Sequence, residues 1–75
     1  MKPGDLMQVA VTNGAFIVDM ATGYTSPKVV PDGTPVLVLG FLDEGGEVVG
    51  DEQKVIILVD GRQGWVFADE LERIA

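Results

Sequence analysis

Two short runs of aliphatic residues constrain the fold of this chain more than any other feature. Val36 to Leu42 and Lys54 to Val59 are bounded by Gly, Pro and acidic residues. Runs of this length and composition are typical of strands, and no window of the sequence has a sustained 3.6-residue apolar period. The 12 Val, 4 Ile and 4 Thr add a β-branched content that suits pleated sheets. We therefore predict an all-β fold.

The segment before these runs predicts a hairpin followed by a long arm. Leu6 to Thr12 alternates loosely and is separated by Asn13-Gly14 from a second apolar run, Ala15 to Met20. Asn-Gly between two strand-like runs is the strongest short-range hairpin signal. From Ala21 to Pro35 the chain carries three Pro and two Gly, so any strand there must be short or lie on an edge.

The last third predicts a tight turn and three short elements. We expect Asp60-Gly61 to form the turn, with Gly61 at positive φ, and Gln63 to Phe67 to form a strand. Ala68 to Leu71 is expected to make one helical turn, with its acidic residues at the favourable N-terminal end. Glu72 to Ile74 then closes the fold as a last strand.

The run DGRQGWVFADELERI, from Asp60 to Ile74, resembles the end of an SH3 domain. In SH3 domains a strand with the pattern Gly-x-x-Gly-aromatic-aliphatic leads into a helical turn and a terminal strand. The upstream run PDGTPVLVLGF resembles the SH3 segment that enters the second strand. The likeness covers roughly residues 30–75. It implies one SH3-like antiparallel barrel domain over residues 1–75, with one short helical turn near the C-terminus. The matching places are taken by Gly61, Gly64, Trp65, Val66 and Leu71.

Two shorter stretches resemble other small proteins. GDLMQV and FADELERI are similar to segments of the small SH3-like accessory protein of photosystem I, and of small proteins from tailed phages, notably those of marine cyanobacteria. This resemblance implies a structural protein that docks on a larger assembly, such as a phage particle.

The chain departs from peptide-binding SH3 domains where they hold proline-rich ligands. Their groove is built from a Trp at the start of the third strand, a Pro and Tyr on the helical turn, and Tyr residues near the first strand. Here these places fall on Gln53 or Lys54, on Phe67 and Glu70, and on no aromatic residue in the first strand. We therefore expect no proline-rich-ligand groove, and Trp65 and Phe67 remain as an aromatic pair that either caps the barrel or binds a partner.

The lack of Cys and His excludes most catalytic and metal chemistry. No imidazole or thiolate is present to serve as a nucleophile, a base or a ligand for zinc or haem. The loop from Asp43 to Glu52 has five carboxylates but does not follow the spacing of a calcium loop, because Gly and Val occupy its middle. We expect a solvated hairpin loop there, and no enzyme, metal or cofactor.

The formal net charge of -7 limits the partners. Duplex nucleic acid and anionic membranes would be repelled, so nucleic acid is an unfavourable partner. The apolar stretches are also too short to cross a bilayer, so we expect no membrane association. The alternative function is a nucleic-acid-associated barrel of the transcription or ribosomal-factor type, although such barrels carry basic loops. A salt-dependent shift on mixing the protein with an oligonucleotide would support this alternative. The opening MKPGDLMQ is unlike a secretory signal, so we expect a cytoplasmic protein, or a virion-associated one if phage-encoded.

The two aliphatic runs break the alternation expected of a barrel strand, because they are apolar on both faces. The resemblance to SH3 domains assigns an inward set: Val36, Val38, Val55, Ile57, Val59 and Val66. The opposite residues would form an apolar patch on the outside of the sheet, larger than monomers usually expose. Either the arm covers this patch with Tyr24, Val29 and Val30, or a protein partner or second copy does. The candidate partner-binding residues are Leu37, Leu39, Ile56, Leu58, Trp65 and Phe67.

Overall fold

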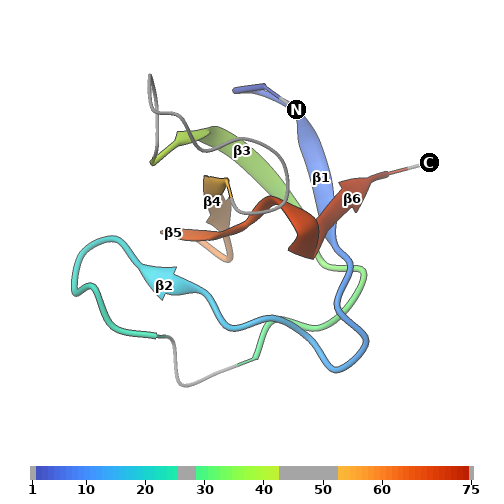
Figure 1. Ribbon diagram of the computed structural model, residues 1–75, viewed down its shortest axis with the longest axis horizontal. Helices are drawn as coiled ribbons and strands as arrows, with labels where there is room; N and C mark the ends of the chain where they lie inside the picture. Colours follow the sequence, from blue (N-terminus) through green and yellow to red (C-terminus); the bar gives the residue numbers. More distant parts are fainter. Residues whose placement is uncertain (1, 26–28, 43–52, 75) are drawn as a thin grey trace.

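The described part of the protein forms a six-stranded antiparallel sheet with one short helical turn, which confirms the all-β prediction. The computed structural model describes residues 2–25, 29–42 and 53–74. Within these residues the strand order is β2-β5-β4-β3-β1-β6 (Figure 1). The elements are β1 (Leu6–Val9), β2 (Val18–Asp19), β3 (Pro35–Phe41), β4 (Lys54–Val59), β5 (Arg62–Phe67), the 3₁₀ turn η2 (Ala68–Glu70) and β6 (Leu71–Arg73).

The two aliphatic runs form the centre of the sheet, as predicted. β4 has the expected bounds and lies between β3 and β5, and β3 begins and ends one residue earlier than expected. β4 and β5 are joined by Asp60 and Gly61, whose φ angles are +51° and +74°. Positive φ at both central residues is the geometry that matches the twist of a two-residue hairpin, so the turn prediction is confirmed.

The predicted hairpin at Asn13-Gly14 is wrong. The chain does turn there, with Gly14 at φ +84° and its N–H donating to the carbonyl of Val11 at 2.8 Å. However, β1 pairs with β3 and β6, whereas β2 pairs with β5. Residue Ala15 instead exchanges two hydrogen bonds of 2.8 Å with Val30, because Gly14 lets the arm approach closely: a Cβ at Gly14 would lie 2.7 Å from the Val30 carbonyl oxygen.

Apart from Pro35, which begins β3, the described residues of the arm from Ala21 to Pro35 have only isolated bridges, as its Pro and Gly content predicts. Its first turn is held by Asp19, whose Oδ1 accepts the N–H groups of Ala21 at 2.7 Å and Thr22 at 3.3 Å. Its return reaches β1 through the N–H of Gly33, which donates to the carbonyl of Val9 at 2.7 Å. Backbone hydrogen bonds therefore fix the path of this segment.

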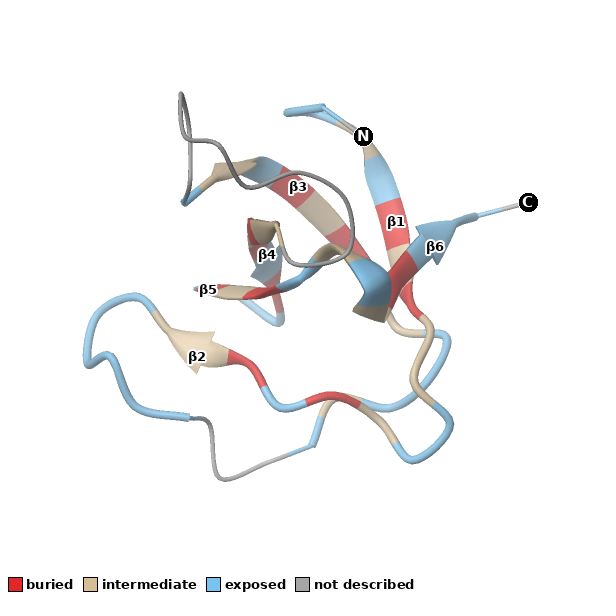
Figure 2. Ribbon diagram, viewed as in Figure 1, coloured by how far each residue is buried: buried red, intermediate tan, exposed pale blue. Residues whose placement is uncertain are grey.

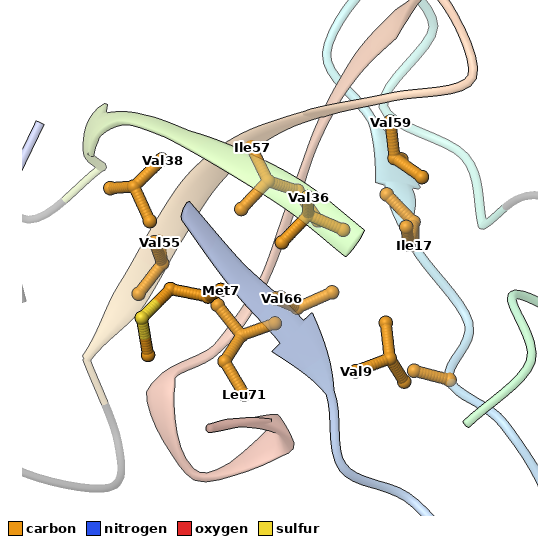
Figure 3. Packing of buried hydrophobic residues seen from close by; sticks show 11 residues of the cluster. Met7, Val9, Ile17, Val36, Val38, Val55, Ile57, Val59, Val66 and Leu71 are labelled. Atoms are coloured by element: carbon orange, nitrogen blue, oxygen red, sulfur yellow. The ribbon is translucent and has the colours of Figure 1, made fainter. Parts of the chain in front are cut away.

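The interior is aliphatic and belongs to one cluster, with no buried polar or charged residue among those described (Figure 2). All six residues of the predicted inward set are buried. The side chains from β3, β4, β5 and β1 converge, and Ile17 and Val59 lie together at one end of the cluster (Figure 3). The remaining core residues are Met7, Val9, Ala15, Ile17 and Leu71.

The C-terminal elements agree with the prediction except in their bounds. The helical turn is η2, where the Glu70 carboxylate accepts the N–H of Phe67 at 3.1 Å. The last strand begins one residue earlier than expected, at Leu71, because that side chain is buried in the core beside Val9, its partner on β1. The described part of the chain contains no helix long and apolar enough to span a membrane.

Candidate partner-binding face

The predicted site residues are brought together on one side of the β3–β4–β5 sheet, which we call the outer face: Leu37, Leu39, Ile56, Leu58, Trp65 and Phe67. Their inward neighbours are buried, so pleating turns these residues outward. The strand register places Leu37 opposite Leu58 and Ile56 opposite Trp65. Side chains directly opposite on neighbouring strands contact one another, so the face is continuous across three strands.

A bulge in β3 changes which residues of this strand point toward the outer face. Val38 pairs with Ile57, but the next pair is Gly40 with Ile56, which leaves Leu39 as the extra residue. The extra residue shifts the phase of the strand, so that Leu39 is exposed whereas Phe41 packs against the core. The bulge therefore gives one strand an outward leucine and an inward phenylalanine only two residues apart.

The aromatic end of the face has a defined geometry. The rings of Trp65 and Phe67 meet edge to face, with centroids 5.3 Å apart and planes at 82°. The Nζ atom of Lys54 lies 5.2 Å from the centroid of the Trp65 ring, within the range of a cation–π contact. Because Lys54 and Phe67 are also cross-strand partners, these three side chains form one cluster at this end of the sheet.

The arm does not cover the outer face with its described residues. Tyr24, one of the three arm residues considered as a cover for the apolar patch, is 78% exposed, and Val29 is also exposed. Val30 turns toward the core instead and pairs with Ala15. The described residues of the arm follow this route because their backbone hydrogen bonds run to the segment around β2 and, at Gly33 and Thr34, to Val9 of β1.

The outer face is partly open. Leu39, Leu58 and Phe67 are exposed to 37%, 36% and 39%, and each lies on a different strand. Leu37, Ile56 and Trp65 are half-buried. About a third of each of the three exposed side chains therefore remains available to a partner.

Sequence reasoning missed two residues that extend this face. Leu6 is 58% exposed and is the cross-strand partner of Leu37, and Val18 is the partner of Trp65 on the other side. The alternation of Leu6 with Met7 was the available signal. This signal could not identify Leu37 as the neighbour of Leu6, because the pairing of β1 with β3 joins residues far apart in the sequence.

The other candidate sites gain no support from the described residues. Residues 2–25, 29–42 and 53–74 include no group of three or more acidic side chains placed to hold a metal ion. The acidic loop from Asp43 to Glu52, predicted to be a solvated hairpin loop, lies outside the described residues.

Comparisons with known proteins add no relative. No protein-family model, no curated protein and no solved structure matches this chain.

Proposed function

We propose that this chain is a non-catalytic protein-interaction module that binds a protein partner, or a second copy of itself, through the outer face. The observation that supports it is the exposure of Leu39, Leu58 and Phe67 on three adjacent strands around the half-buried Trp65. The resemblance of residues 30–75 to SH3 domains supports an SH3-like module, and the short resemblance to phage proteins supports docking on a larger assembly.

The exposed area limits the strength of this interaction. Fully covering a large apolar side chain is worth about 1.5–3 kcal/mol, so a side chain that is one-third exposed offers about 0.5–1 kcal/mol. Association costs about 4–15 kcal/mol in lost rigid-body freedom. Three such side chains, with smaller contributions from their half-buried neighbours, offset only the low end of that cost. We therefore expect reversible association, not an obligate dimer.

The proposal is tested with the double variant Leu39→Lys/Leu58→Lys. Both positions are exposed, so the charges should abolish association and leave folding intact. Tyr24→Lys is the matched control, because this residue is still more exposed and lies off the face. Sedimentation equilibrium from micromolar to millimolar concentration should show self-association of the wild type and of Tyr24→Lys, and a monomer for the double variant.

If the wild type stays monomeric, the proposal requires that the partner is another protein. Photo-crosslinking in the source cells then tests whether such a partner binds the outer face. A photoreactive residue at position 58 should give a discrete protein adduct that Leu39→Lys removes, whereas the same probe at position 24 should give none. A monomeric wild type without a Leu39-dependent adduct would overturn the proposal.

A further inference from the structure

A pocket that contains none of the outer-face residues lies where the arm faces the β4–β5 turn. It is a pocket of about 580 Å³, within the size range of small-molecule sites. Its apolar walls include Ile17 and Val59, which lie together at one end of the buried cluster (Figure 3), and Val30 and Pro35 from the two ends of the arm's return. Val59 is on the inward side of β4, so this pocket is separate from the outer face.

Acidic residues outnumber basic residues in the lining of the pocket. The residues that line it include two acids, Asp19 and Asp60, and one base, Arg62. The Oδ1 atom of Asp19 accepts two backbone N–H groups of the arm, which fixes the carboxylate in place. The ionisable residues that line the pocket therefore carry a net negative charge, which favours a cation as the ligand.

We propose that this pocket binds a small organic cation with an apolar body, of the arylalkylammonium class. The apolar body lies against Ile17, Val30 and Val59, and the ammonium group lies at the carboxylates of Asp19 and Asp60. Neither the outer face nor a protein partner is needed for this binding, so it is independent of the proposed function.

Titration of the isotope-labelled protein with phenethylammonium, followed by NMR, tests the proposal. We expect saturable shifts of the Ile17, Val30 and Val59 methyl groups, with the indole signal of Trp65 unchanged. Phenylacetate is the matched anion of similar size, and it should bind several-fold more weakly. No saturable shift, equal binding of the two compounds, or shifts centred on Trp65 would each overturn the proposal.

Two conservative variants test the role of charge. Asp60→Asn removes one carboxylate of the pocket and keeps a residue that tolerates positive φ, so it should weaken phenethylammonium binding about two- to fivefold. Asp69→Asn removes an exposed carboxylate on η2 and changes the net charge equally, and it should leave the affinity unchanged. Equal losses in both variants would show attraction by net charge alone and would contradict binding at this pocket.

Discussion

The β3–β4–β5 sheet and the segment from Ala10 to Thr34 are held in place by different forces. The sheet is ordered by alternate aliphatic side chains that are buried on its inner side. The Ala10–Thr34 segment buries only Ala15 and Ile17 among its described residues and follows a path set by turns, backbone hydrogen bonds and close approaches at glycine. Side-chain burial therefore specifies one region, and backbone packing specifies the other.

The largest effect should come from removing a core side chain of the sheet. Ile57→Ala leaves a cavity at the fully buried centre, and it should lower the free energy of unfolding by about 2–5 kcal/mol. Leu58→Ala is the matched control, since it removes an outward side chain on the same strand and should cost less than about 1 kcal/mol. Urea unfolding measures both, and similar losses would contradict the assignment of inner and outer faces.

A smaller effect should come from the close approach of β2 to β5. Gly64→Ala would place its Cβ 2.8 Å from the Val18 carbonyl oxygen and against the Ile17 side chain, and overpacking of this kind costs about 1–3 kcal/mol. Gly40→Ala is the control, because a Cβ there meets nothing within 4 Å. Thermal unfolding should give a lower melting temperature for Gly64→Ala than for Gly40→Ala. Equal melting temperatures would contradict the conclusion that the close contact of β2 with Gly64 holds β2 in place.

The smallest expected effect is at the hairpin turn of the sheet. Gly61→Val forces a β-branched residue to positive φ and should cost about 1 kcal/mol, the low end of the cost of such strain, because a Cβ at Gly61 meets no other atom within 4 Å. Gly61→Asn should cost less, because Asn tolerates this region. An unchanged melting temperature for Gly61→Val would mean that the turn does not require the geometry of Gly61.

The difference between the two regions also explains what could be predicted from the sequence. β4 follows from local composition, and the six inward residues follow from the resemblance to SH3 domains; both were predicted correctly. Leu6 pairs with Leu37 and Ala15 pairs with Val30, and neither partner can be identified from the local sequence. The predicted hairpin was therefore wrong, and Leu6 was missed as a residue of the outer face. The contacts that require glycine at position 64 are with Ile17 and Val18, which lie beside it because β2 pairs with β5, and this pairing joins residues far apart in the sequence.

The pairing of β1 with β6 has a consequence for the order of folding. Gln8 and Glu72 are joined by a side-chain hydrogen bond although they lie 64 positions apart, whereas β4 and β5 are linked by a two-residue turn. Closing a long loop costs more chain entropy than closing a short one, and folds with distant pairings reach the native state slowly. We expect the β4–β5 hairpin to belong to the folding nucleus and β6 to dock on β1 late, so substitutions in β6 should speed unfolding more than they slow folding.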